Sequence, residues 1–168
     1  NAFRDYARAP DIDLNRFDVG KLVHEVVDLH RAQESDIRIV LKTASEMPMI
    51  EADIGRMRQI LHNLIRNATE ALENTTDGRI EVHVSMGEIN GAEVVQIRVE
   101  DNGPGFSEGA VSQVFDPYVT TKPKGTGLGL AIVKKLVEEH VGSIRAYNNA
   151  DGGAVVSVRL PLNEAARE

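Results

Sequence analysis

The chain has 168 residues, of which 26 are acidic and 19 are basic, so its formal net charge is -7. This charge argues against a nucleic-acid partner, because binding a phosphate backbone requires a basic surface. The absence of cysteine excludes disulfide bonds and thiolate metal sites. No apolar run is long enough to span a bilayer, and the length suits one domain with a buried core.

The first third of the chain predicts two helical segments and two strands. Residues 1–10 read as the end of a helix that stops at Pro10, so we expect the chain to be part of a longer protein. Apolar residues recur at helical spacing over 19–29. Alternation predicts a strand over 37–41 and a short second strand over 49–52.

The middle of the chain predicts a long amphipathic helix followed by a hairpin. Asp53 is placed to cap a helix whose apolar face runs from Ile54 to Leu72. Apolar residues alternate over 80–86 and again over 95–99, on either side of a turn near Asn90-Gly91. We expect one face of this hairpin to be buried.

The last third predicts one more helix and one more hairpin. A helical pattern after the glycine-rich region continues to Gly142, which we expect to be the C′ residue. Strands over 144–147 and 154–160 flank a turn at residues 151–153. Residues 163–168 are expected to be a frayed end. The whole pattern predicts an α+β fold in which helices pack on one face of a mostly antiparallel sheet.

Two glycine clusters, at 101–106 and 124–129, flank a polar loop and suggest a nucleotide site. Glycine lets a backbone approach a ligand closely, and the second cluster enters a helix whose free N–H groups suit a phosphate. Lys122 and Lys124 add positive charge nearby. The dinucleotide pattern G-x-G-x-x-G fails because residue 132 is Ile, and no Walker pattern is present.

Asp101 has the same parity as the apolar residues of the strand over 95–99, so its carboxylate should point toward the core. A buried carboxylate needs a partner. The amino group of an adenine could provide one. Alternatively, Asp101 closes an Asx-turn over Gly103, and the residue alone does not decide between these interpretations.

The long helix carries a polar stripe composed of Gln59, Asn63, Arg66, Asn67 and Glu70. Its amide oxygens could bind a hard cation such as Mg²⁺, although for this helix alone a solvated face is the simpler interpretation. The five histidines show no metal-ligand spacing on one face, so we assign them no chemical role.

Four motifs together resemble the catalytic, ATP-binding domain of sensor histidine kinases, within the superfamily that includes gyrase, Hsp90 and MutL. Residues 59–68 are similar to the N box, 101–105 to the first glycine box, 115–118 to the F box and 125–130 to the second glycine box. The motifs occur in the family's order. Pro104, the short segment 120–124 and the opening ten residues look most like the nitrogen-regulation type.

The resemblance implies a two-layer α/β sandwich, known as the Bergerat fold, and a role for each matching residue. Asn67 would coordinate Mg²⁺, Asn63 would face the phosphates, Arg66 would supply charge, and Asp101 would bind the adenine amino group. The other residues that the resemblance assigns to ATP binding are Gly103, Gly105, Lys122, Lys124, Gly125, Thr126, Gly127, Leu128 and Gly129. Phe115 would anchor the lid over the phosphates.

The resemblance also implies an activity and partners. The domain, residues 11–162, would transfer the γ-phosphoryl group of ATP to a His on a dimerisation helix pair, of which residues 1–10 would be a remnant. A response-regulator Asp would then receive it. The domain is expected in the cytoplasm, as part of a homodimer anchored in the inner membrane, and the fragment alone is expected to be monomeric.

Two positions depart from the family pattern, and two other functions stay open. Many members have Lys where this chain has Glu70, and Thr where it has Ala154, so we expect altered nucleotide affinity. One alternative is an ATP hydrolase of the gyrase/Hsp90 kind, but Asn63 replaces the Glu that would activate water there. The other is a non-catalytic nucleotide-sensing module.

Overall fold

The computed structural model describes residues 11–34, 36–44, 46–117 and 129–162, and its main layer is a five-stranded sheet in the order β2-β4-β5-β7-β6. The strands are β2 (Arg38–Thr43), β4 (Arg79–Ile89), β5 (Ala92–Asp101), β6 (Ser143–Asn148) and β7 (Ala154–Pro161). Only β2 and β4 pair in parallel, and the other neighbouring pairs are antiparallel. The segments 1–10 and 163–168, expected to be a helix remnant and a frayed end, lie outside the described residues.

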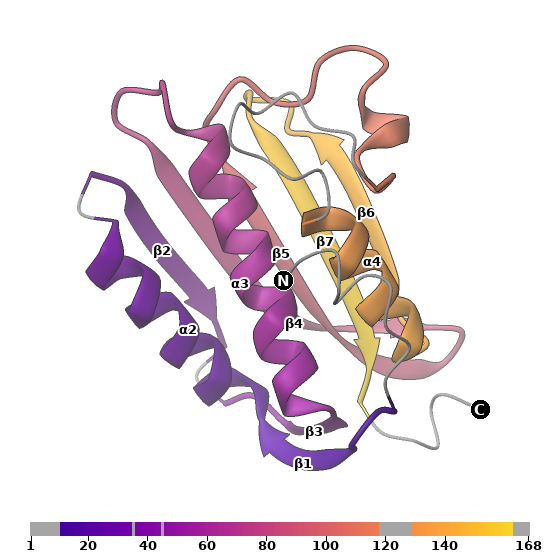
Figure 1. The fold of residues 1–168 in the computed structure, drawn as a ribbon. Helices are drawn as coiled ribbons and strands as arrows, with labels where there is room; N and C mark the ends of the chain where they lie inside the picture. The colour runs from indigo at the N-terminus through magenta and orange to yellow at the C-terminus, as the bar shows by residue number, and fades with distance from the viewer. Residues whose placement is uncertain (1–10, 35, 45, 118–128, 163–168) are drawn as a thin grey trace.

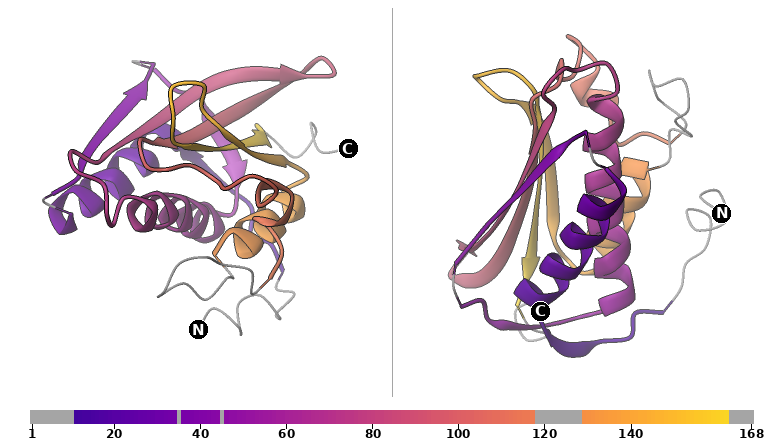
Figure 2. Two further views of the ribbon diagram at one scale, coloured as in Figure 1. Left: turned by 90° about the horizontal axis from the view of Figure 1, so that it is seen from above. Right: turned by 90° about the vertical axis from the view of Figure 1, so that its left-hand side faces the viewer.

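Three helices form the second layer and cover one face of this sheet, as Figures 1 and 2 show. They are α2 (Val19–Gln33), α3 (Ile54–Ala71) and α4 (Gly129–Glu139), and a 3₁₀ turn η1 (Val111–Gln113) lies in the loop before α4. This arrangement confirms the predicted two-layer α+β sandwich. Within the described ranges, no helix is both long and apolar enough to cross a membrane.

The central helix α3 begins where the sequence predicts, at the N-cap Asp53. One carboxylate oxygen of Asp53 accepts a hydrogen bond from the backbone N–H of Arg56 at 3.1 Å, satisfying a donor that the first turn leaves free. The apolar face of α3 is fully buried against the sheet and is made of Met57, Ile60, Leu61, Leu64, Ile65 and Ala68. This packing fixes the position of α3 on the sheet, and with it the position of the polar stripe on the opposite side of the helix.

A second, two-stranded sheet was not predicted in full. Strand β3 (Met49–Ala52) lies where we expected it, but it pairs antiparallel with β1 (Asn15–Asp18) instead of joining the main sheet. Strand β1 has the sequence Asn-Arg-Phe-Asp, in which only Phe17 is buried, opposite Ile50. One apolar residue in four gives no alternating pattern, so the pairing with β3 defines this strand.

The end of α4 differs from the prediction. The residue in the left-handed conformation is Val141, with φ of 57°, and not Gly142. The N–H of Val141 donates to Glu138 O and the N–H of Gly142 to Val137 O, both at 2.9 Å, which is the bond pattern of a Schellman motif. Gly142 is needed for another reason: a Cβ there would overlap the carbonyl oxygen of Arg159 and approach Leu160 Cδ2 to 2.8 Å.

His140 connects the start of α3 to the end of α4. It is 1% exposed, its Nδ1 lies 2.8 Å from Leu136 O, and its Nε2 accepts the backbone N–H of Asp53 at 3.2 Å. A neutral imidazole with its proton on Nδ1 satisfies both contacts. His140 thus joins the ends of the two helices through backbone contacts.

Candidate functional site

Asp101 ends the central strand β5 and faces the helix layer, as its parity predicted. The residue is 6% exposed, and its Oδ1 accepts the backbone N–H of Gly103 at 2.9 Å and that of Ala154 at 3.3 Å. The Asx-turn interpretation is therefore correct. It does not exclude a ligand, because a carboxylate has about four acceptor positions, and the two amides hold the group in one orientation.

The loop after Asp101 is held tightly between α3 and the β6–β7 hairpin. A Cβ on Gly103 would lie 2.8 Å from the carbonyl oxygen of Ala71, at the end of α3. Gly105 has φ of 80°, and a Cβ there would lie 2.8 Å from Asn148 Oδ1. Asn148 clamps the next residue, because its Oδ1 accepts the N–H of Phe106 at 2.7 Å and its Nδ2 donates to Phe106 O at 2.9 Å. The glycines in this box are thus required by the fold itself.

The polar stripe of α3 faces away from the sheet and contains the predicted metal and phosphate residues. Asn63 and Asn67 are half-buried, one helical turn apart, and Arg66 is exposed between them. Glu70, which replaces the family's lysine, is half-buried on the same stripe. Asn67 offers an amide oxygen, the hard donor that Mg²⁺ accepts beside phosphates and water, so the donor set fits one protein ligand to this ion.

Asn63 joins the N box to the second glycine box. Its Nδ2 donates to the carbonyl oxygen of Gly129, the first residue of α4, at 3.4 Å. Phe115, the predicted lid anchor, is half-buried and packs against the edge of the core. The remaining residues of the predicted lid, Lys122, Lys124, Gly125, Thr126, Gly127 and Leu128, lie outside the described residues.

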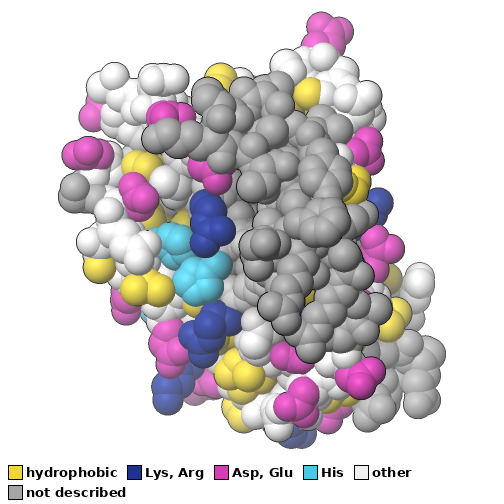
Figure 3. All heavy atoms as spheres, in the orientation of Figure 1, with side chains coloured by type: hydrophobic (Ala, Val, Ile, Leu, Met, Phe, Trp, Pro, Cys, Tyr) yellow, Lys and Arg dark blue, Asp and Glu magenta, His cyan; other side chains and the backbone are white. Residues whose placement is uncertain are grey.

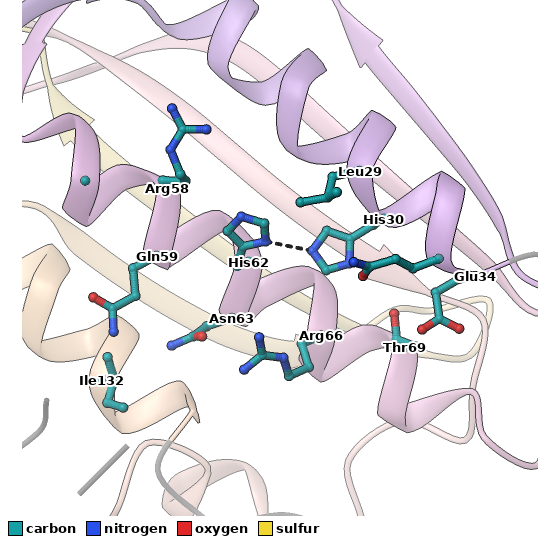
Figure 4. Close-up of a pocket in the computed structure, with 12 residues that line it drawn as sticks. Leu29, His30, Glu34, Arg58, Gln59, His62, Asn63, Arg66, Thr69 and Ile132 are labelled. Atoms are coloured by element: carbon teal, nitrogen blue, oxygen red, sulfur yellow. Dashed lines mark hydrogen bonds between the residues drawn. The ribbon is translucent and has the colours of Figure 1, made fainter. Parts of the chain in front are cut away.

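Beside the stripe, a cavity of about 630 Å³ lies between α2 and α3, with Ile132 of α4 on its other side. Figure 4 shows Asn63 and Arg66 in its lining, together with a pair of imidazoles that the sequence did not predict. His30 Nε2 and His62 Nδ1 lie 2.9 Å apart. In Figure 3 the histidine side chains lie between two basic groups. Figure 4 labels two arginines in the cavity lining, Arg58 and Arg66.

The pKa of each imidazole is lowered by its surroundings. Burial lowers the pKa of His30, and the charges of His62 and Arg66 lower it further. Burial also lowers the pKa of His62, together with Arg66 and Arg58. The hydrogen bond between the two rings, in which one nitrogen donates and the other accepts, links α2 to α3. Asp101, at the end of β5, is not among the described residues that line this cavity.

The two histidines are 32 residues apart in the chain and lie on different helices. A search for spacing within one helix therefore could not have detected the pair. A second missed group lies on the outer face of the sheet, where Glu81, His83 and Glu100 approach one another. The sequence could have indicated this group of residues. All three residues have outward parity in the predicted hairpin, and only the register between β4 and β5 was needed to bring them together.

Comparison with known proteins gives consistent matches. The family model described as histidine kinase-, DNA gyrase B- and HSP90-like ATPase matches residues 52–164. A relative from Rickettsia bellii, named sensor histidine kinase NtrY-like, is 33% identical over 159 residues, which is 95% of this chain. The chain spans 25% of the length of that relative.

Solved structures show the same fold. The catalytic domain of histidine kinase ThkA is 31% identical with a TM-score of 0.80, over 92% of this chain and 99% of that one. A complex of ThkA with the response regulator protein TrrA also matches, at 28% identity and a TM-score of 0.78, over 95% of this chain and 45% of that one. Full-length ShkA in complex with AMPPNP is 33% identical with a TM-score of 0.79, over 96% of this chain and 34% of that one.

These matches bear out the resemblance that the four ordered motifs predicted, including its likeness to the nitrogen-regulation kinases. Both the sequence matches and the structural matches cover nine-tenths or more of the chain. The family model covers the region from the last residue of β3 through β7. The chain belongs to the family of histidine kinase-, DNA gyrase B- and HSP90-like ATPases.

Proposed function

We propose that this chain is the ATP-binding catalytic domain of a sensor histidine kinase, with residues 11–162 forming the domain. The domain positions ATP so that its γ-phosphoryl group passes to a His on the dimerisation helices of the parent protein, and from there to an Asp of a response regulator. The AMPPNP named for the ShkA structure and the regulator named for the ThkA complex support this assignment.

The observation that carries the proposal is the contact of α3 with both glycine boxes. At its end, the carbonyl of Ala71 packs against Gly103 of the first box. One and two turns earlier, Asn67 and Asn63 face away from the sheet, and Asn63 bonds Gly129 of the second box. Motifs separated by up to 66 residues therefore meet on one helix, as a single ligand with a base at one end and phosphates at the other requires.

Each residue has a role that its surroundings support. The carboxylate of Asp101, fixed by two backbone amides, accepts a hydrogen bond from the adenine amino group. Gly105 keeps the loop close to the base, Asn67 holds Mg²⁺, Asn63 faces the phosphates, and Arg66 supplies positive charge. Mg²⁺ when bound neutralises phosphate charge. The proposal also assigns phosphate contacts to Lys122, Lys124, Gly125, Thr126, Gly127, Leu128 and Gly129.

Transfer is favoured over hydrolysis because of Asn63. A hydrolase of this superfamily needs a carboxylate at that position to take a proton from water, and an amide cannot act as that base. In this structure, the amide of Asn63 instead donates to the carbonyl of Gly129. It thereby ties α3 to the helix that follows the phosphate-binding segment, so the residue supports positioning and not proton abstraction.

Calorimetry with Mg-ADP and Mg-ATP tests the binding site. Asp101→Asn should weaken binding about tenfold to a hundredfold, the loss of one charge-assisted hydrogen bond worth about 1.5–3 kcal/mol. An Asn at this position can still accept the amides of Gly103 and Ala154, so the fold should survive. Asn67→Ala should weaken binding in Mg²⁺ more than in EDTA.

The matched control is Asp36→Asn, the same chemical change at an exposed loop position. It should leave the affinity unchanged. Equal affinity of wild type and Asp101→Asn, with both proteins folded by thermal melting, would contradict the assignment of Asp101.

Labelling with [γ-³²P]ATP tests the phosphotransfer. The chain alone should bind ATP and acquire no phosphohistidine, because the predicted acceptor belongs to the dimerisation helices. His24 resembles a phosphoacceptor of the family in being followed by Glu, here Glu25, but it is exposed on α2. Adding a fragment that contains the parent protein's helix pair should place the label on that fragment. Stoichiometric label on His24 would contradict the proposal.

A further inference from the structure

The outer face of the main sheet, opposite the helices, carries a compact polar cluster. Glu81 and His83 project outward from β4, and Glu100 projects outward from β5, between the inward-facing residues of each strand. Their side chains are only 18%, 22% and 18% exposed. We call these three residues the outer cluster. It lies on the opposite face of the sheet from the proposed nucleotide site.

The outer cluster breaks a rule of sheet pairing. Glu81 and Glu100 are direct cross-strand partners in the antiparallel β4–β5 pair, and two like charges at such positions repel each other. A sequence usually departs from a local rule where something else compensates or where function requires it. The two facing carboxylates attract cations, and Lys42, Arg79 and Arg98 each contact one of them.

Two distances within the cluster are close to those between neighbouring ligands of one metal ion. His83 Nε2 lies 3.3 Å from Glu81 Oε1 and 3.1 Å from Glu100 Oε2, and the three ligand atoms all lie within 4.8 Å of one another. Nitrogen and oxygen ligands about 2.0–2.2 Å from a tetrahedral Zn²⁺ are separated from each other by about 3.3–3.6 Å. The two separations that involve His83 are therefore within a few tenths of an ångström of those in such a site, and the two carboxylate oxygens lie within 4.8 Å of each other.

His83 Nε2 lies close to both carboxylates without a hydrogen bond to either of them. The atom is buried and, within the described part of the chain, has no hydrogen bond of acceptable geometry, although both oxygens are close. A nitrogen that coordinates an ion between the two carboxylates would likewise make no hydrogen bond to them. A buried polar atom without a hydrogen bond otherwise has a cost.

The other oxygen of each carboxylate lies next to an arginine. Arg79 contacts Glu81 Oε2 at 3.3 Å, and Arg98 contacts Glu100 Oε1 at 3.3 Å. Each arginine thus leaves the oxygen nearer His83 for another cation. Groups that orient ligands in this way are a regular part of metal sites.

Among the described residues, Lys42 is the cation that contacts Glu81 Oε1, the oxygen of Glu81 that lies nearest His83. Its Nζ lies 2.7 Å from Glu81 Oε1, and its side chain is 57% exposed. A half-exposed lysine on an edge strand can turn into solvent at little cost, because exposed ion pairs contribute at most about 1 kcal/mol. Lys42 is therefore a competitor that a divalent ion can displace.

We propose that Glu81, His83 and Glu100 form a binding site for a divalent transition-metal ion, with Zn²⁺ as the best fit. One imidazole and two carboxylates make a mixed donor set that suits Zn²⁺ better than Mg²⁺ or Ca²⁺, which take oxygen ligands. Three protein ligands leave a fourth position for water. The ion would join β4 to β5 directly behind the strand end that carries Asp101.

The test is calorimetric titration of the metal-free chain with ZnCl₂, without nucleotide. We expect one ion per chain, and a melting temperature that rises with Zn²⁺ because the ion binds the folded state. His83→Gln and Glu100→Gln should each weaken binding by at least about tenfold. Mg²⁺ in large excess should not displace the ion.

Lys42→Met gives the sharpest outcome, because its effect should have the opposite sign. Removing the competing ammonium should strengthen Zn²⁺ binding several-fold, and this surface substitution leaves the core untouched. The matched control is His62→Gln, which alters the other histidine group of the described chain and should leave Zn²⁺ affinity unchanged.

Three results would overturn the proposal. They are the absence of Zn²⁺ binding to the wild-type chain, equal binding by wild type and His83→Gln, and loss of binding in His62→Gln, which would place the ion between α2 and α3. Melting curves in EDTA establish that each variant is folded. If His83→Gln or Glu100→Gln does not fold, the increase in Lys42→Met decides the question.

Discussion

Gly153 shows how closely single atoms are packed around Asp101. It lies in the turn between β6 and β7 with φ of 91°, and a Cβ at this position would overlap the backbone carbonyl oxygen of Asp101. Its neighbour Gly152 has nearly the same φ, 95°, but a Cβ there would meet nothing within 4 Å. The two adjacent glycines therefore separate the cost of backbone conformation from the cost of steric overlap.

We predict that Gly153→Ala lowers the free energy of unfolding by about 3 kcal/mol or more, because both costs apply. Gly152→Ala should lower it by only about 1 kcal/mol, since only the left-handed conformation is penalised. Urea denaturation of both variants measures the difference. Equal losses would show that the loop yields freely and does not fix Asp101.

The His30–His62 pair predicts a pH dependence of stability. Both pKa values are lowered in the folded state, so below about pH 6.5, the ordinary value for His, the unfolded chain binds protons more readily. Stability should therefore be full above that pH and decline as the pH falls toward the folded pKa values. The groups facing the pair are Arg58 and Arg66 of α3, Glu34 of α2 and the apolar Ile132 of α4.

Urea denaturation between about pH 7.5 and about pH 5.5 tests this. We expect the wild-type free energy of unfolding to decrease across this range, and to decrease less in His62→Gln, where only His30 titrates in the pair. Gln can still hydrogen-bond His30, so the variant should fold. Identical pH profiles for the two proteins would show that the pair does not contribute.

At the scale of elements, α4 ends with a residue poorly suited to its conformation. Val141 is β-branched, 58% exposed and in the left-handed region with φ of 57°. For a residue with a Cβ this region costs about 1–2 kcal/mol. The Schellman bonds to Glu138 and Val137 impose the conformation, because they satisfy carbonyls that the helix end would leave free.

We predict that Val141→Gly stabilises the protein by about 1 kcal/mol, since glycine adopts this φ without strain. Val141→Ala is the control, because it also removes an exposed apolar side chain but retains Cβ. It should gain less than the glycine variant. Thermal melting compares the two, and a loss of stability in Val141→Gly would mean that the side chain makes a contact worth more than the strain.

At the scale of the whole molecule, the position of β5 in the sheet sets the order of local stability. It pairs with β4 on one side and with β7 on the other, and α3 packs over it. The strands β2 and β6 are at the edges, and among the described strands β1 pairs with β3 alone. Amides of a central strand exchange only when most of the domain opens, whereas edge strands open locally.

Hydrogen exchange should therefore be slowest in β5 and β7 and fastest in β1, β2 and β6 among the described strands. Because Asp101 ends the slowest strand, the carboxylate proposed to bind adenine is anchored in the most stable part of the sheet. Exchange in β5 as fast as in β6 would mean that the sheet opens as independent hairpins. Added Mg-ADP should slow exchange further at residues 101–106.

The sequence alone determined the family and most of the helices and strands, with β1 as the exception. Helical and strand periodicity depend on neighbours only a few residues apart, and so do the cap at Asp53 and the turn at Asn90-Gly91. The four motifs identified the family because their order is a property of the chain. The inward direction of Asp101 followed from the parity of one strand, and the buried residue confirms it.

Only the tertiary structure decided which residues meet across elements. Periodicity tells which way a side chain points but not which element lies opposite, so His30 and His62 were treated as unrelated. The outer cluster needed the β4–β5 register, which sets Glu81 opposite Glu100. Strand β1 forms because it pairs with β3. Val141 adopts the left-handed conformation because the hydrogen bonds at the end of α4 require it. In each case the cause is a contact between segments distant in sequence, or a backbone bond pattern that outweighs the residue's own preference.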